Sequence, residues 1–98
     1  MEWMLIFQAL IEAIAKCIDE RNPRRRSRAQ VEAGLLNPGL LEAACLRQIL
    51  KDQFGLRGRE LRRRGREGIE VLKSLPKEHI IGWCDEAEEL NAPGAANA

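Results

Sequence analysis

Arginines gathered in two clusters are the side chains of this sequence best suited to chemistry, and that chemistry is the binding of anions. The first arginine cluster consists of Arg24, Arg25, Arg26 and Arg28, and the second arginine cluster consists of Arg57, Arg59, Arg62, Arg63, Arg64 and Arg66. A guanidinium group stays charged and is not buried without a partner, so each cluster requires phosphates, carboxylates or water around it. The partner is therefore a nucleic acid, an acidic protein or the acidic C-terminal part of the chain itself.

Charge is distributed unevenly along the chain. Of its 16 Lys and Arg residues, 13 lie in residues 21–66 beside four Asp or Glu, which gives that stretch a charge of +9. Residues 1–20 carry −3 (one Lys against four acids) and residues 67–98 carry −5 (two Lys against seven acids), so the net charge is only +1. A total so close to zero argues against indiscriminate binding of polyanions, and attraction to anions must come from the clusters themselves.

Residues that support catalysis or metal binding are few and poorly spaced. His79 is the single histidine, and Cys84 lies five residues further along the same predicted helix, so the two do not share a face. The remaining cysteines, Cys17 and Cys45, have no paired spacing that would complete a four-ligand zinc site. The glycines of residues 55–58 are too close together for a phosphate-binding loop. The sequence therefore predicts no enzyme, no catalytic residue, no metal site and no cofactor.

The N-terminal segment and the cysteines bear on location. Residues 3–18 are strongly apolar, but Gln8, Glu12 and Lys16 interrupt them at steps of four, as in an amphipathic helix rather than a membrane span. The polar face of this helix is mainly acidic, which does not suit anionic lipid, and its start lacks the basic residues of a signal peptide. The cysteines are odd in number and lie among apolar neighbours, which favours free thiols in a reducing compartment. We therefore expect a cytoplasmic protein with no membrane partner.

Apolar residues recur at the helical period and predict four to five helices and no strand. The expected ranges are 2–20, 28–36, 38–54, 58–74 and 76–90. A chain of 98 residues with 45% hydrophobic and 32% charged content suits one folded domain. We expect an all-α fold, a compact bundle forming a single helical domain over residues 1–90, with a flexible C-terminal tail over residues 91–98.

Local signals mark several helix ends. Ser27 and Gln30 form a capping-box pattern that starts the second helix. Asn37 followed by Pro38 predicts the start of the third helix, with Asn37 as its cap, and Gly55 predicts its end. Two further glycines, at positions 65 and 68, lie on the apolar seam of the 58–74 helix, where each costs about 1 kcal/mol relative to alanine. They predict that a neighbouring helix approaches closely at that seam.

The N-terminal helix carries an unusually wide apolar face. Trp3, Phe7 and Leu10 lie on one stripe, and Met4 and Ile11 lie beside it. A face this wide is buried on more than one side, either centrally in the bundle or partly against another molecule. We expect a homodimer through this helix, or its docking in a partner's groove.

Residues 47–66 also fit a helix-turn-helix, with Gly55 at the turn and the second arginine cluster on the second helix. Arginines there suit phosphates and guanine edges. Two positions depart from the motif, because Lys51 lies where a small residue is expected and Arg64 lies where an apolar contact is expected. The helix also lacks the Ser, Thr, Asn or Gln residues that usually accompany arginine in base recognition. DNA binding is therefore the alternative hypothesis.

In style the chain resembles a small accessory protein encoded by a bacteriophage or mobile element of a high-GC host. The features behind this resemblance are the arginine-heavy runs at 24–28 and 62–64, the lack of catalytic groups and the single plain domain. The resemblance implies a protein that binds and inhibits a host enzyme or regulator, for instance a motor ATPase, a nuclease complex or a transcription factor.

We therefore predict a non-enzymatic binding protein that associates with the acidic surface of a larger protein and modulates or inhibits it. The predicted partner-binding residues are Trp3, Phe7, Leu10, Arg24, Arg25, Arg26, Arg28, Arg59, Arg62, Arg63 and Arg66. The alternative is a helix-turn-helix-like transcription regulator that binds DNA through residues 57–66. A third reading needs no partner, because the acidic face of the last helix could pair with the arginines of the 58–74 helix.

Overall fold

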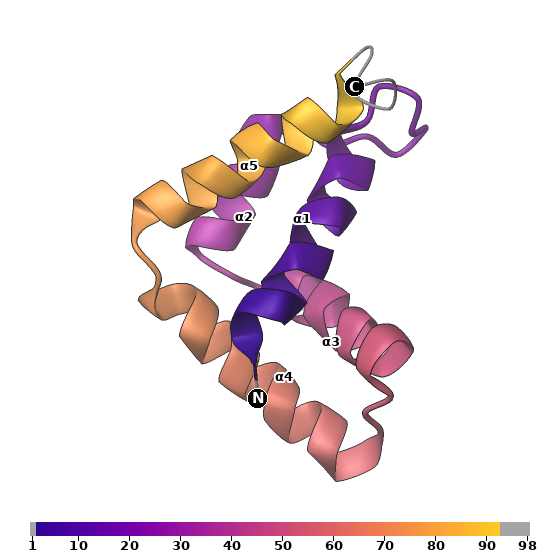
Figure 1. Ribbon diagram of the computed structural model, residues 1–98, viewed down its shortest axis with the longest axis vertical. Coiled ribbons are helices and arrows are strands. Elements are labelled where there is room, and N and C mark those ends of the chain that lie inside the picture. The colour runs from indigo at the N-terminus through magenta and orange to yellow at the C-terminus, as the bar shows by residue number, and fades with distance from the viewer. Residues whose placement is uncertain (1, 93–98) are drawn as a thin grey trace.

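A computed structural model describes residues 2–92 of the chain and places five helices in them (Figure 1). The helices are α1 (Trp3–Ile18), α2 (Arg28–Leu36), α3 (Leu40–Phe54), α4 (Gly58–Ser74) and α5 (Lys77–Asn91). Within residues 2–92 there is no strand, so the prediction of an all-α bundle is confirmed. Within the same residues, no helix combines the length and the apolar character needed to cross a membrane.

Helix α1 lies at the centre of the bundle. Its most extensive contact is with α5 and it also contacts α2 and α3, while α4 packs mainly on α3 (Figure 1). Its wide apolar face is therefore covered within the same chain, by α2, α3 and α5 and, at Trp3, by α4. The Phe7 ring sits between two tryptophans, with ring centroids 6.0 Å from Trp3 and 5.0 Å from Trp83. These rings join the N-terminal half of α1 to α5, and Leu46 and Leu50 complete the core from α3.

The predicted helix ends are partly confirmed. Ser27 Oγ accepts a hydrogen bond from the backbone N–H of Gln30 (3.1 Å), and Gln30 Oε1 accepts one from the N–H of Ser27 (2.9 Å), so the capping box exists. Gly55 ends α3 in the left-handed conformation, with φ 68°. The first helix ends at Ile18 rather than residue 20, because the backbone N–H of Arg21 bonds to the Asp19 carboxylate and closes a turn there.

The predicted start of the third helix is wrong. The backbone N–H of Asn37 bonds to the carbonyl of Ala33, so Asn37 closes α2 instead of capping α3. Helix α3 begins at Leu40, and the N–H of Gly39 donates to Glu42 Oε2 at 3.0 Å. A carboxylate in the first turn thus supplies the cap that a side chain at position 37 was expected to supply.

The two glycines on the seam of α4 lie where neighbours approach closely, as predicted. A Cβ atom on Gly68 would lie 2.6 Å from Leu46 Cδ2 and 2.6 Å from the Trp3 ring, and one on Gly65 would lie 2.9 Å from Arg47 Cγ. This contact holds the inner face of α4 against α1 and α3, so the opposite face of α4 is turned to solvent.

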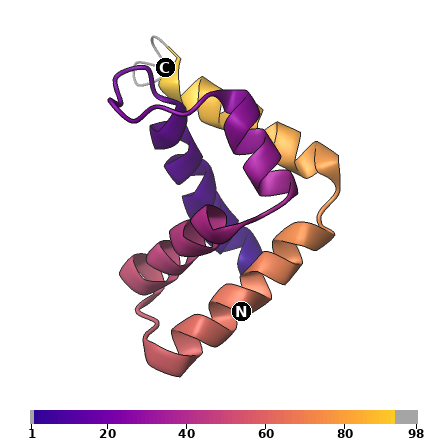
Figure 2. The same ribbon diagram turned by 180° about the vertical axis from the view of Figure 1, so that it is seen from behind.

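The two ends of the bundle differ in what they contain. Helices α3 and α4 form a hairpin whose connecting turn lies at one end of the molecule, opposite α5, as both views show (Figures 1 and 2). At the other end α5 continues through Asn91, whose side chain donates a hydrogen bond to the carbonyl of Ala15 at 2.6 Å. Of the predicted flexible tail, residues 93–98 lie outside the described residues.

Candidate arginine-lined binding surfaces

Arg28 of the first arginine cluster is tied to the chain's own acids. Its Nη1 lies 2.7 Å from Asp85 Oδ1 and also pairs with Glu88, and its Nε lies 3.5 Å from Glu32 on its own helix. Hydrogen bonds to Glu88 and Asp85 raise the pKa of Arg28 above its usual value. The acidic face of α5 thus pairs with α2, and not with the arginines of α4 as the partner-free reading expected.

The rest of the first arginine cluster is divided between pairing and solvent. Arg26 Nη2 lies 3.8 Å from Glu42 Oε1, and Arg25 Nη1 lies 3.9 Å from the exposed Glu20 carboxylate. Arg24 is exposed, and no carboxylate of residues 2–92 pairs with it. Of the four predicted partner-binding arginines here, only Arg28 is therefore hydrogen-bonded to acids of the chain, while Arg25 and Arg26 have long ion pairs and keep donors for another partner.

The second arginine cluster faces outward from α4. Its arginine face consists of Arg59, Arg62, Arg63 and Arg66, whose spacing of three and four residues aligns them on one side of the helix. All four are exposed, and Glu60 lies among them on the same open surface. Within residues 2–92 no carboxylate pairs with Arg59, Arg62 or Arg66.

Ion pairs within α4 involve Arg63 of the arginine face and its neighbour Arg64. Glu60 accepts from Arg63 Nη2 at 2.6 Å and from Arg64 Nε at 3.0 Å, and Arg64 Nη1 reaches Glu67 at 3.0 Å. Hydrogen bonds from Arg64 and then Arg63 lower the pKa of Glu60 below its ordinary value. Arg64, which departs from the helix-turn-helix pattern, thus lies in an ion-pair network on α4.

The three predicted partner-binding residues of α1 do not form a surface. The exposed fractions of Phe7 and Leu10 are 1% and 4%, because both pack in the core beneath α5 and α3. Side chains this deeply buried offer no area to a partner while the fold is intact, so this part of the prediction is corrected. Trp3 is half-buried and its Nε1 donates to Glu67 at 3.2 Å. The exposed apolar side chains of α1 are instead Met4 and Leu5.

Two of the three cysteines, Cys45 and Cys84, lie in surroundings that do not activate a thiol. Burial raises the pKa of Cys84 and of Cys45, which keeps both thiols protonated and poorly nucleophilic near neutral pH. Within residues 2–92 no group of three or more His, Cys, Asp or Glu side chains could hold a metal ion.

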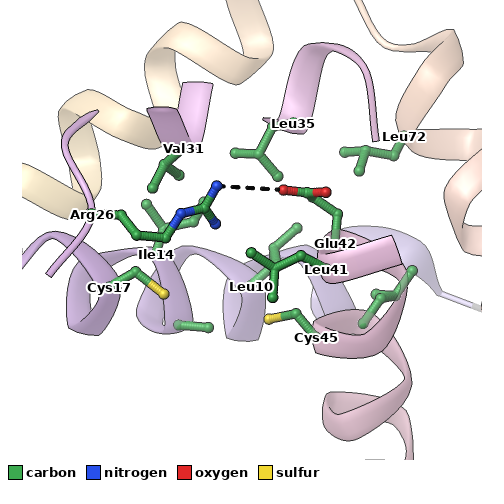
Figure 3. A pocket seen from close by; sticks show the side chains of 12 residues that line it. Leu10, Ile14, Cys17, Arg26, Val31, Leu35, Leu41, Glu42, Cys45 and Leu72 are labelled. Atoms are coloured by element: carbon green, nitrogen blue, oxygen red, sulfur yellow. Dashed lines mark ion pairs between the residues drawn. The ribbon is translucent and has the colours of Figure 1, made fainter. Parts of the chain in front are cut away.

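A cavity between α1, α2 and α3 is the site that sequence reasoning missed (Figure 3). Its volume is about 140 Å³, its walls are almost entirely apolar, and the Arg26–Glu42 pair spans its opening. The one sequence signal for it is Gly34 on α2, because a Cβ atom there would collide with the Glu42 carboxylate. Glycine at that position leaves room for a carboxylate that the helical pattern alone does not place.

No protein-family model, no curated protein and no solved structure matches the chain significantly, so its function is argued from the geometry of these surfaces.

Proposed function

We propose that the protein is a non-enzymatic binding protein that associates, through the arginine face of α4, with an acidic surface on a larger protein and modulates or inhibits it. The observation that carries the proposal is the alignment of Arg59, Arg62 and Arg66 on one exposed side of α4 with no carboxylate of residues 2–92 paired to them. Planar guanidinium groups bind carboxylates with two parallel hydrogen bonds, and arginine is enriched in protein interfaces for that reason.

An acidic protein fits this face better than a nucleic acid does. Glu60 lies within the face and bonds to Arg63, so a phosphate backbone would meet a negative charge there, whereas a protein partner can place a Lys or a hydroxyl opposite it. Residues 57–66 contain no Ser, Thr, Asn or Gln for reading bases. Arg28 is already bonded to acids of the same chain, and only Arg24 and Arg25 of the first arginine cluster are exposed, so the arginine face of α4 is the positive patch with more exposed arginines on a molecule of net charge +1.

The decisive experiment compares partner binding by the wild-type protein and by the Arg59→Ala/Arg62→Ala/Arg66→Ala variant. A protein captured from a lysate of cells that produce this chain is purified, and its affinity is measured for both forms. Loss of three charged contacts of about 1 kcal/mol each weakens binding by about a hundredfold. Circular dichroism checks that the variant stays folded, which is expected because all three side chains are exposed.

A matched control removes the same charge elsewhere on the surface. The control variant carries Lys16→Ala, Arg24→Ala and Lys77→Ala, three exposed positions with no ion-pair partner in residues 2–92. Binding by the control should change little. Equal weakening by both triple variants would mean that only overall charge matters, and a captured protein that binds both forms as tightly as wild type would overturn the proposal.

DNA binding is the second candidate, and one observation favours it. The α3 helix, the Gly55 turn and α4 form a hairpin (Figure 2), and the second helix of this hairpin carries the exposed arginine face. A duplex titration over several salt concentrations distinguishes it. DNA binding requires retention at about 0.15 M salt and a salt slope that decreases by about 3 in the Arg59/Arg62/Arg66 variant. A dimer through α1 stays a prediction, with Met4 and Leu5 as the exposed apolar side chains that α1 would contribute.

A further inference from the structure

The cavity between α1, α2 and α3 has the size and walls of a binding site for a small apolar group. Its floor and sides include Leu10, Ile14, Val31, Leu35 and Leu46, and its volume is about 140 Å³. An apolar cavity of about 150 Å³ stays dry and accepts a molecule the size of benzene. Atoms that line an empty cavity lack contact partners on one side, so a ligand that fills it gains dispersion contacts.

The opening of this cavity holds a guanidinium group with unused donors. Arg26 Nη2 is 3.8 Å from Glu42 Oε1, which is too long for a hydrogen bond, and the Arg26 side chain donates none to residues 2–92. Figure 3 shows the guanidinium and the carboxylate facing each other among the lining side chains. The Arg26 side chain is 31% exposed, so a head group can reach it from solvent. Leu41, which is 56% exposed, forms the outer wall beside it.

Glu42 is held in place independently of Arg26. Its Oε2 accepts the N–H of Gly39 at 3.0 Å, and the absence of a side chain on Gly34 leaves space for its carboxylate. Only one carboxylate oxygen of Glu42, Oε1, therefore faces Arg26. The remaining N–H groups of the Arg26 guanidinium are left for a second anion. Arg24 and Arg25 lie on the same loop as Arg26, so the local field favours an anion over a neutral group.

We propose that this cavity binds a small amphiphile with one anionic head group, held by Arg26, and an apolar tail of about six carbon atoms, held by the walls of the cavity. The tail contacts Ile14 and Leu35 inside the cavity. The head group accepts hydrogen bonds from the Arg26 guanidinium, beside the Glu42 carboxylate. This site is separate from the arginine face of α4 and does not depend on the function proposed for that face.

The test is a chain-length series of straight-chain carboxylates. Acetate, butanoate, hexanoate and octanoate are titrated into the full chain while the methyl NMR signals of Ile14 and Leu35 are followed. Each added CH₂ should tighten binding about fourfold until the tail fills the cavity, and octanoate should then gain less than that. Affinity that does not rise with chain length, or shifts confined to methyl groups outside the cavity, would overturn the proposal.

Two variants separate the head-group contact from the tail contact. Arg26→Met should weaken hexanoate about tenfold while leaving hexanol unchanged, because only the anion loses its charged hydrogen bonds. Arg25→Met, on the same loop, is the matched control and should leave hexanoate binding unchanged. Equal weakening by both variants would mean a diffuse charge effect and would rule out a head-group site at Arg26.

Filling the cavity tests the tail contact. Ala13→Leu places a larger side chain among the lining residues and should abolish hexanoate binding. If that variant does not fold, Cys45→Leu fills the same space from α3. Undiminished hexanoate binding in a folded, filled variant would overturn the proposal, as would loss of hexanoate binding in the Arg59/Arg62/Arg66 variant, which leaves the cavity intact.

Discussion

The two arginine clusters have similar composition, and the fold uses them in opposite ways. In the first arginine cluster, Arg28 joins α2 to two acids of α5 and Arg26 faces Glu42 of α3. In the second, the acids that pair with arginine, Glu60 and Glu67, lie on the same helix. The first cluster therefore connects elements of the bundle, whereas the second leaves a positive face exposed. Counting charges along a sequence does not distinguish these outcomes.

The two clusters differ because folding brings carboxylates of other helices to the first cluster and none to the second within residues 2–92. Asp85 and Glu88 are close to Arg28 because α5 packs on α2, although about sixty residues separate them in the chain. Helix α4 packs its glycine seam on α1 and α3, and within residues 2–92 its arginines form ion pairs only with acids of α4 itself. An isolated pair at the surface is worth about 0–1 kcal/mol, so the helix packing places the charges and the charges contribute only modestly to the packing.

The largest expected effect comes from breaking the contact that orients α4. Gly68→Ala places a Cβ atom 2.6 Å from Leu46 and from the Trp3 ring, and we expect the free energy of unfolding to fall by about 2 kcal/mol. Chemical denaturation measures this change. The matched control is Gly82→Ala in the middle of α5, where no atom lies within 4 Å of the added Cβ. The control should stabilise the protein by about 1 kcal/mol, and equal effects of the two changes would contradict the close approach.

A smaller effect distinguishes the clusters directly. Arg28→Ala removes the pairs to Asp85 and Glu88, and we expect it to lower the free energy of unfolding by about 1 kcal/mol. Arg62→Ala removes an exposed side chain with no paired carboxylate in residues 2–92 and should change stability by less than about 0.5 kcal/mol. Denaturation at low and high salt tests both, because salt should shrink only the effect of Arg28→Ala. Equal losses of unfolding free energy in the Arg28→Ala and Arg62→Ala variants would show that the two clusters do not differ in their contribution to stability.

The smallest effect concerns the pairs within α4. Arg64 and Arg63 lower the pKa of Glu60 in the folded protein. Their pairs with Glu60 therefore contribute fully to folding stability above the ordinary Glu pKa of about 4.3. This contribution is lost as the pH falls through the lower pKa of the folded state. A carboxyl NMR titration should show Glu60 with a pKa below that ordinary value. The Arg63→Ala/Arg64→Ala variant should return it toward the ordinary value, and an unshifted Glu60 in the wild type would show that these pairs do not persist in solution.

Local sequence signals predicted most of the helices and few of the contacts. The helical period, the Ser27–Gln30 capping box and the left-handed Gly55 were readable because each depends on neighbours within about four residues. The start of α3 could not be predicted in the same way, because the carboxylate of Glu42 bonds to the Gly39 N–H while Asn37 closes α2. The two α4 glycines correctly indicated a close approach, without indicating that Leu46 and Trp3 fill it.

The sequence by itself determined that the chain is helical, where most of its helices begin and end, and that its arginines fall into two clusters, because these properties depend on residue types at short spacing. Only the tertiary structure decided which arginines meet carboxylates, that Phe7 and Leu10 lie in the core, and that a cavity opens beside Arg26. Those features join residues far apart in the chain. Their positions follow from how the apolar faces of five helices bury one another, a condition that no single segment contains.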